Sequence, residues 1–259
     1  MAVVVKHNAG FFSCCNIRLW DIITFINTNK GLPLKVDSSQ QFQWYKTINR
    51  DVTFDYFKNY EKIDIPCKLS YPIDYHHDYQ FSDYSTLQYK NIVPLIHKYF
   101  TPSDEVYTYM NQIEQKYSMD FENTCVLFYR GNDKNRETSI CNYDEYVEYA
   151  HKVLAKNPNT VFLIQSDETE FIQMFQSLFP TSFYFKDEIR HMKKCDSTVD
   201  LTMRQNIELF SKYYLAITVI MAKCKYIVCG TGNCSLWIMF YRGNNKNVFQ
   251  NKDGKWIES

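Results

Sequence analysis

Short apolar runs alternate along the chain with longer segments in which apolar residues recur every three or four positions. The apolar runs lie at residues 3–5, 125–129, 160–165 and 225–229. Runs of this length that are apolar throughout are typical of strands buried on both faces of a parallel sheet. Because helix-period segments separate the runs, the pattern predicts an α/β fold.

Helix signals are clearest in the second half of the chain. Asn142 and Glu145 have the spacing of a capping box, and Ser103 is well placed to cap an earlier helix. A further strand is expected at 181–185. The predicted helices cover residues 17–27, 103–117, 143–156, 168–179, 200–222 and 235–241.

The chain has 259 residues, which is enough for two domains of common size. We expect an N-terminal α/β domain over residues 1–118 and a clearer C-terminal α/β domain over residues 119–259. Residues 54–119 contain many tyrosines and several prolines, and they show no sustained period. This stretch is therefore assigned only as a mixed region that completes the first domain.

Composition narrows the class of protein. The 29 basic and 29 acidic residues cancel, whereas nucleic-acid binding normally shows as a basic excess. The nine cysteines, Cys67 among them, are an odd number without a Cys-x-x-Cys pair, which favours reduced, buried thiols. No long hydrophobic signal region opens the chain, and the longest apolar run, 215–222, is too short to span a membrane. We expect a soluble, cytoplasmic protein that binds no nucleic acid.

Polar residues and glycines directly follow four of the predicted strands. They occupy positions 7–10, 130–134, 166–168 and 230–235. Because ligands of parallel sheets bind outside the carboxyl ends of the strands, we expect these four segments to converge. The five charged residues within positions 130–137 are then explained as part of a ligand cleft, and a solvated ion-pair turn is the alternative.

The glycine turn at 230–235 has the features of an anion-binding site. Its glycines let the backbone approach a ligand, and the next helix offers free N–H groups and a positive dipole end. Thr231 and Ser235 add hydroxyl donors. The guanidinium of Arg130 suits bidentate contact with phosphate. Together these groups predict a clamp for a pyrophosphate.

Other ligand chemistries have weaker support. The 230–235 turn resembles a dinucleotide fingerprint but ends the last predicted βα unit, and residues 236–259 are too few for another crossover. A P-loop is absent from the sequence. His76, His77 and Asp78 are expected to be polar loop residues, because adjacent side chains seldom converge on one metal ion. No Asp-x-Asp occurs, which argues against metal-bridged binding of a sugar nucleotide, and we expect no metal.

Three segments resemble, in order, the fucosyltransferase-like superfamily of GT-B glycosyltransferases. FYRGNDK (128–134) is similar to its strand-end Arg-x-x-Asp-Lys motif. LIQSDETEFIQMFQSLFP resembles the next unit, and YIVCGTGNCSLWIMFYRG resembles the last one, where a small-residue loop holds the diphosphate. The resemblance covers roughly residues 120–245 and implies a GT-B-like fold, in which two Rossmann-like domains with parallel sheets face a cleft.

The resemblance also implies roles for the matching residues. Arg130 would bind the donor diphosphate, and Asp133 and Lys134 would hold that loop and the sugar side. Ser166 and Asp167 would lie near the nucleoside. The first loop of the chain would face the donor across the cleft, where Arg18 could add charge. The implied donor-binding residues are Asn8, Gly10, Phe11, Arg130, Lys134, Ser166, Asp167, Gly230, Thr231, Gly232, Asn233 and Ser235.

The general base of part of the family is a Glu five residues after the motif Asp. Thr138 occupies that position here, and Glu137 sits one place earlier. We predict Glu137 as the base and Asp133 as the fallback, with Arg130 completing the catalytic set.

Three departures from the family pattern leave the donor open. Phe128 and Gly131 replace the usual His and second Arg, and Thr218 stands near the place of an acidic residue. Contacts that select guanine are therefore in question.

The sequence thus predicts a metal-independent, inverting glycosyltransferase. Its donor is a nucleotide-diphosphate sugar, GDP-fucose-like or UDP-xylose-like, and its acceptor is a glycan or glycoprotein hydroxyl, against which the Tyr-rich stretch could stack. Two alternatives stay open, a non-catalytic glycan- or nucleotide-binding module of the same fold and an NAD-dependent α/β enzyme. The composition also resembles that of large-DNA-virus glycosyltransferases.

Overall fold

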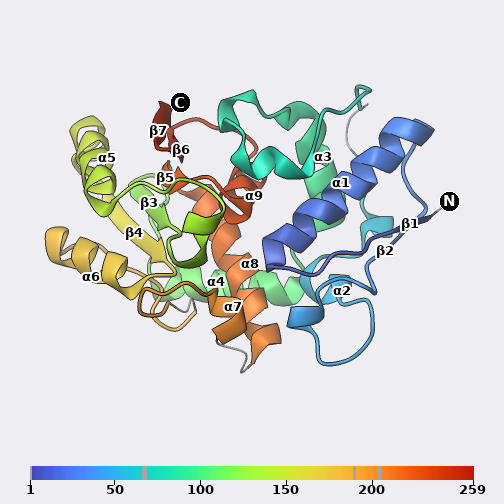
Figure 1. The fold of residues 1–259 in the computed structure, drawn as a ribbon, viewed down its shortest axis with the longest axis horizontal. Coiled ribbons are helices and arrows are strands. Elements are labelled where there is room, and N and C mark those ends of the chain that lie inside the picture. Colours follow the sequence, from blue (N-terminus) through green and yellow to red (C-terminus); the bar gives the residue numbers. More distant parts are fainter. Residues whose placement is uncertain (1, 66–68, 189–190, 203–205) are drawn as a thin grey trace.

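Two parallel sheets organise the chain, as the computed structural model shows for residues 2–65, 69–188, 191–202 and 206–259 (Figure 1). A small sheet pairs β1 (Ala2–Val4) with β2 (Lys35–Asp37). The larger sheet has the strand order β4-β3-β5-β6-β7, in which the first four strands are parallel. The predicted α/β class is confirmed, and the C-terminal sheet is the more complete one.

The larger sheet is buried on both faces. All six residues of β3 are buried, and they alternate between two cores. Leu127 packs in a core on the side of α5 and α6, whereas Val126 and Phe128 pack in the core shared with the N-terminal half. The strands are β3 (Thr124–Tyr129), β4 (Val161–Ser166), β5 (Tyr226–Gly230), β6 (Val248–Lys252) and β7 (Lys255–Glu258).

Helices cover both faces of this sheet. Helices α5 and α6 lie at its outer face, and α8 and α9 lie toward α1 and the small sheet (Figure 1). The helices are α1 (Phe11–Asn29), α2 (Thr53–Tyr56), α3 (Tyr89–Phe100), α4 (Asp104–Lys116), α5 (Tyr143–Lys156), α6 (Thr169–Leu178), α7 (Val199–Thr202), α8 (Ile207–Lys223) and α9 (Asn233–Arg242). Short 3-10 helices are η1 (Gln43–Tyr45), η2 (Tyr60–Lys62), η3 (His77–Phe81), η4 (Tyr84–Thr86) and η5 (Asn132–Arg136).

Capping residues set the predicted helix starts. The hydroxyl oxygen of Ser103 accepts a hydrogen bond from the Val106 amide at 3.4 Å, at the start of α4. Asn142 and Glu145 form a complete capping box at the start of α5. Helix α1 begins at Phe11, earlier than predicted, because residues 11–15 are almost wholly buried and so show no amphipathic period. The long helix predicted at 200–222 is found as α7 and α8, and residues 203–205 lie outside the described part.

Two strand predictions were wrong. The segment predicted as a strand at 181–185 makes only one bridge, between Phe183 and Leu163 of the edge strand β4. Conversely, the segment after β5 does complete a further crossover, because the ten residues of α9 and a short loop lead into β6. Ile227 of β5 pairs with Val248 of β6 in parallel.

The Tyr-rich region is mainly core. Tyr56, Tyr75, Tyr84 and Tyr99 are buried, so packing rather than glycan stacking explains them. Helix α3, which was not predicted, contains Pro94. The domain boundary after residue 118 stays a prediction, since α4 on one side of it packs against α8 on the other.

The described cysteines are free thiols, and Cys195 is the exposed one among them. This agrees with the predicted reduced, buried thiols at the other described positions, and Cys67 lies outside the described residues. Within the described part of the chain, no helix is both long and apolar enough to cross a membrane.

Candidate active site

A cavity of about 500 Å³ lies at the carboxyl ends of β3 and β5, where they face the start of α1. Ten of the predicted site residues line it: Gly10, Phe11, Arg130, Asp133, Lys134, Glu137, Thr231, Gly232, Asn233 and Ser235. The strand-end segments at 7–10, 130–134 and 230–235 therefore converge as the parallel topology predicts. A volume of this size suits a small-molecule ligand.

Arg130 follows β3 directly and is held by two carboxylates. Its Nε donates to Oδ2 of Asp167 at 2.8 Å, and a terminal nitrogen donates to Oδ1 of Asp133 at 3.3 Å. Burial alone would lower the pKa of Arg130, but these carboxylates outweigh it and hold the pKa well above its ordinary value. The guanidinium thus stays charged and keeps 29% of its side chain exposed at the cavity.

Lys134 and Glu137 form the second charged pair at the cavity. Both lie in or next to η5, three residues apart, and the Lys134 ammonium contacts Oε2 of Glu137. The Lys134 side chain is only 9% exposed, and its ammonium lies 5.3 Å from the centre of the Phe81 ring. In contrast, 46% of the Glu137 side chain is exposed, so this carboxylate is free to move toward a ligand.

The turn before α9 presents backbone amides to the cavity. The first bond of α9 runs from the Leu236 amide to the Gly232 carbonyl at 2.9 Å. The amides of residues 233–235 therefore have no carbonyl of their own helix to bind, and they carry the positive end of the helix dipole. The Gly232 amide is used differently, since it donates to the Gln80 carbonyl at 3.0 Å.

Gly232 is required by both its conformation and its surroundings. Its φ of +151° is one that side chains rarely adopt, and a Cβ there would lie 3.0 Å from Cε of Lys134. The absence of a side chain thus lets Lys134 lie directly against the turn. This contact brings the ammonium and the helix N-terminus to the same end of the cavity.

Asp167 lies behind Arg130 rather than in the main cavity. Its carboxylate accepts from Arg130 and from the Gly131 amide at 2.9 Å, and its side chain is 6% exposed. Together with Ser166 it lines a small side cavity of about 40 Å³ next to Arg130. Asp167 therefore fixes the orientation of the Arg130 guanidinium at the edge of the main cavity.

Two other predicted binding residues lie elsewhere. The side-chain nitrogen of Asn8 donates to the Gln40 carbonyl at 3.0 Å, and its side-chain oxygen accepts from the Gln43 backbone amide at 3.0 Å. Asn8 thus holds the loop at residues 40–43 and is not among the residues that line the cavity. Gly230 ends β5 and lines a separate cavity of about 20 Å³.

Arg18, which could have added charge to the site, is fully buried in the N-terminal core. Its guanidinium lies 5.4 Å from the Phe100 ring centre and 5.9 Å from that of Tyr60. The buried face of α1 carries Arg18 into this aromatic core instead of toward the cavity.

Sequence reasoning missed several residues that line the cavity. Gln80 and Phe81 come from η3, Trp44 comes from η1, and Asp200 and Tyr214 come from α7 and α8. The aromatic region gave no period from which to place η1 or η3. For Asp200 a signal existed in the sequence. It is an acidic residue at the start of the helix predicted at 200–222, which is the next predicted helix after the one that follows the acidic turn at 166–168.

Asp200 faces Arg130 and the first loop. Its Oδ2 is 3.8 Å from the position of a Cβ on Gly10. Burial raises the pKa of Asp200, and the neighbouring carboxylates of Asp133 and Asp167 raise it further, whereas Arg130 lowers it. The net effect is a carboxyl that is more basic than an ordinary aspartate, which makes it a second candidate proton acceptor.

Gly131 explains one departure from the family motif. A Cβ at this position would fall inside van der Waals contact with the Glu168 carboxylate and 2.7 Å from Cε1 of Tyr129. Glu168 is fully buried and accepts a hydrogen bond from the Tyr143 hydroxyl. The space that a second Arg would need next to Arg130 is thus filled by Glu168.

We expect Gly131→Ala to destabilise the chain by about 1–3 kcal/mol, because the added methyl overpacks a buried site. Urea unfolding followed by circular dichroism measures this. Gly31→Ala is the matched control, since the nearest atom to its new Cβ is a carbonyl oxygen at 3.9 Å. Equal stabilities of the two variants would show that Glu168 does not constrain position 131.

Thr218 stands near the position at which the family has an acidic residue, and its side chain cannot take the place of that carboxylate. The side chain is fully buried, and its hydroxyl donates to the Tyr214 carbonyl at 2.9 Å within α8. Tyr214, one turn earlier, lines the cavity instead. The α8 side chain that reaches the cavity here is therefore an aromatic ring.

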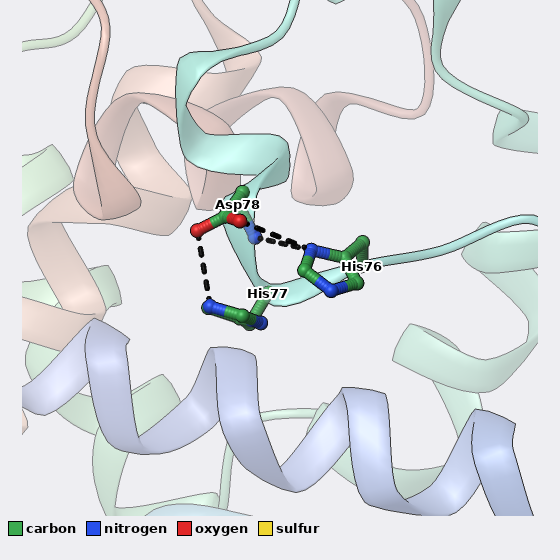
Figure 2. Close-up of side chains that lie close together, drawn as sticks. All are labelled: His76, His77 and Asp78. Carbon is green, nitrogen blue, oxygen red and sulfur yellow. Dashed lines mark hydrogen bonds and ion pairs between the residues drawn. The ribbon is translucent and has the colours of Figure 1, made fainter.

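His76, His77 and Asp78 lie at the start of η3 (Figure 2). The sequence prediction treated them as unrelated polar groups, because adjacent side chains seldom converge. In the structure they do converge, with their ligand atoms within 4.8 Å of one another. None of the three lines the cavity, so they are separate from the candidate active site.

No protein-family model matches the sequence, and no curated protein matches it either. Solved structures do match over the whole chain. NodZ α-1,6-fucosyltransferase co-crystallised with GDP is 12% identical, with a TM-score of 0.58 and coverage of 100% of this chain and 98% of that one. The same enzyme soaked with GDP-fucose is 8% identical, with a TM-score of 0.59 and coverage of 100% and 99%.

A third structure, fucosyltransferase NodZ from Bradyrhizobium, is 10% identical, with a TM-score of 0.56 and coverage of 99% and 98%. At such low identities the likeness concerns the fold alone. The chain therefore has the GT-B-like α/β fold that NodZ has. The cavity of this chain lies at the carboxyl ends of its parallel strands.

Proposed function

We propose that this chain is a glycosyltransferase that moves a sugar from a nucleotide-diphosphate sugar to a hydroxyl group of a glycan or glycoprotein. The observation that carries the proposal is that Arg130 and the turn at 231–235, about a hundred residues apart in sequence, line one cavity. Both are suited to a diphosphate, the first by its fixed charge and the second by its amides. The fold shared with NodZ supports the same proposal.

The proposed chemistry places the leaving diphosphate against Arg130, Lys134 and the amides of residues 233–235. Negative charge builds on the diphosphate as the glycosidic bond breaks, and preorganised cations and amides stabilise that charge. The acceptor hydroxyl attacks the anomeric carbon from the opposite side, so the configuration inverts, through an oxocarbenium-like transition state. The protein cations supply the stabilisation, and the transfer is proposed to need no metal ion.

Glu137 is the proposed general base. It lines the cavity, and 46% of its side chain is exposed. Its carboxylate forms an ion pair with the Lys134 ammonium. When a diphosphate engages Lys134, that pair opens and the carboxylate becomes available to accept the proton of the acceptor hydroxyl. Asp133 is the fallback, but Arg130 engages it.

The donor is proposed to be GDP-fucose-like or UDP-xylose-like. The NodZ structures contain GDP or were soaked with GDP-fucose, which favours testing guanine donors first. Tyr214 and the buried Thr218 provide no acidic partner for guanine, which keeps uracil donors in the comparison. A large-DNA-virus origin and a cytoplasmic location are part of the proposal and are not tested by the donor panel.

A donor panel tests the proposal. We expect GDP or UDP, and the matching sugar nucleotides, to raise the melting temperature. The reason is that a ligand of the cavity binds only the folded chain and so stabilises it. NAD should give no shift. Transfer or hydrolysis of the stabilising donor should proceed equally in EDTA and in Mn²⁺. Loss of activity in EDTA that Mn²⁺ restores would contradict the metal-free chemistry, and a shift by NAD alone would favour an NAD-dependent enzyme.

A non-catalytic binding module of the same fold is the second candidate. The observation in its favour is that Thr138 stands at the family's base position and that Glu137 is ion-paired. A donor that stabilises the chain but is neither hydrolysed nor transferred to any acceptor would favour this candidate.

A further inference from the structure

Two imidazoles and a carboxylate meet at the start of η3 (Figure 2). Nε2 of His77 lies 3.0 Å from Oδ1 of Asp78, and Nδ1 of His76 lies 3.3 Å from Oδ2 of Asp78. All three ligand atoms lie within 4.8 Å of one another. The side chains are between 41% and 62% exposed, so an ion can reach them from solvent.

These separations fit the coordination shell of a small transition-metal ion. Bonds of 2.0–2.1 Å in a tetrahedral shell place neighbouring ligand atoms about 3.3 Å apart. Each imidazole nitrogen lies close to this distance from one oxygen of Asp78, His77 from Oδ1 and His76 from Oδ2. For both nitrogens and one carboxylate oxygen to bind the same ion, the partly exposed side chains rotate, and the Asp78 amide gives up its 3.3 Å hydrogen bond to Nδ1 of His76.

Helix α1 already holds the cluster in place. The ring of Trp20 lies 5.4 Å from the His76 ring centre and 5.0 Å from the His77 ring centre. The buried Asn16 side chain donates to the His77 carbonyl at 2.7 Å. The backbone of the cluster is thus positioned before an ion binds, so only side chains have to be ordered, which limits the cost of binding.

We propose that His76, His77 and Asp78 form a binding site for one divalent transition-metal ion of the zinc class. Two imidazole nitrogens and one carboxylate are the ligands that such ions prefer, and water completes the shell. Magnesium and calcium prefer all-oxygen sites, so they are not expected there.

The consequence of this site lies in η3 itself. Its first residues carry the cluster, and its last residues, Gln80 and Phe81, line the cavity beside Gly232 and Lys134. An ion at the start of η3 therefore fixes the segment that closes one side of the cavity. The site lies outside the cavity lining, so no step of the proposed transfer uses the ion, and the test of the site needs no active enzyme.

Calorimetric titration of the metal-stripped chain with ZnCl₂ tests the proposal. We use a Cys195→Ser background, because an exposed thiol also binds zinc. The expected result is one zinc ion per chain and a rise in melting temperature, with MgCl₂ giving neither. His77→Gln and Asp78→Asn should each weaken zinc binding by about tenfold or more.

His97→Gln is the matched control, since His97 is an exposed imidazole in the last turn of α3. It should bind zinc as the background does. Melting of the metal-free variants shows whether they fold, and the exposed positions predict that they do. Zinc binding that is absent, that survives His77→Gln and Asp78→Asn, or that His97→Gln weakens equally would overturn the proposal.

Discussion

Arg130→Ala is expected to lower kcat/KM for sugar transfer by about 10²- to 10³-fold, the usual loss when one preorganised group that stabilises transition-state charge is removed. The orientation of the Arg130 guanidinium is fixed, because it donates hydrogen bonds to both Asp167 and Asp133. Arg130→Lys should recover only part of the loss, because an ammonium cannot contact the diphosphate and Asp167 in the same bidentate geometry. Steady-state kinetics with the donor found by thermal shift measures both variants.

Arg136→Ala is the control for this experiment. Arg136 lies in the same short helix, η5, but its side chain is 65% exposed and faces Asp196 at 3.7 Å. Its removal should leave kcat/KM within about twofold, because a surface ion pair contributes little. Near-normal turnover of Arg130→Ala would show that the donor diphosphate binds somewhere else.

Glu137→Gln is expected to lower kcat by about 10²- to 10⁴-fold, the range for loss of a general base. Donor affinity should stay the same or rise, because the substitution removes the ion pair that the diphosphate otherwise has to open. The substitution keeps the size of the side chain and removes its ability to take up a proton. Glu148→Gln, an exposed position on α5, is the matched control. Kinetics at saturating donor separates an effect on the chemical step from an effect on binding.

Asp200→Asn tests the alternative that Asp200, and not Glu137, is the general base. If this variant, rather than Glu137→Gln, loses turnover, then Asp200 is the base. The pH profile provides a second test of Asp200. Because burial raises the pKa of Asp200, its carboxylate is protonated at a higher pH than that of an ordinary aspartate. As the pH is lowered, activity that depended on Asp200 would therefore begin to fall at a higher pH than activity that depended on an aspartate of ordinary pKa, because the base becomes protonated.

The C-terminal sheet was predictable because its strands are apolar throughout. A strand buried on both faces, such as β3, needs apolar residues at every position and is visible as an unbroken run. The cap at Ser103 and the capping box at Asn142 were predictable for a similar reason, since both act within a few residues of sequence. Strand β2, by contrast, is three residues long, and its register comes from pairing with β1 rather than from its own pattern.

The candidate site was predictable only where residues follow strands. The topology carries Arg130 and the 231–235 turn to one edge of the sheet, and the parallel pattern alone implied this meeting. Trp44 and Phe81 reach the cavity from short 3-10 helices in a region without period, so their position depends on tertiary packing. Asn8 lies outside the cavity lining because its side-chain amide bonds to the neighbouring loop at residues 40–43, and its role in binding stays a prediction.

Cluster formation at His76, His77 and Asp78 also depends on packing. In an extended strand neighbouring side chains point to opposite faces, and this is why their adjacency argued against a common ligand. The chain instead turns into η3 after His76, and Trp20 of α1 packs against both rings. Both features follow from the fold and leave no signal in the local sequence.

A crystal structure of the chain with bound GDP or UDP, whichever raises its melting temperature, tests the shared diphosphate site most directly. We expect the phosphate oxygens within hydrogen-bonding distance of the Arg130 guanidinium and of the amides at 233–235, with Lys134 turned from Glu137 toward the phosphate. A diphosphate bound away from Arg130, or held through a divalent ion by the cavity carboxylates, would contradict it.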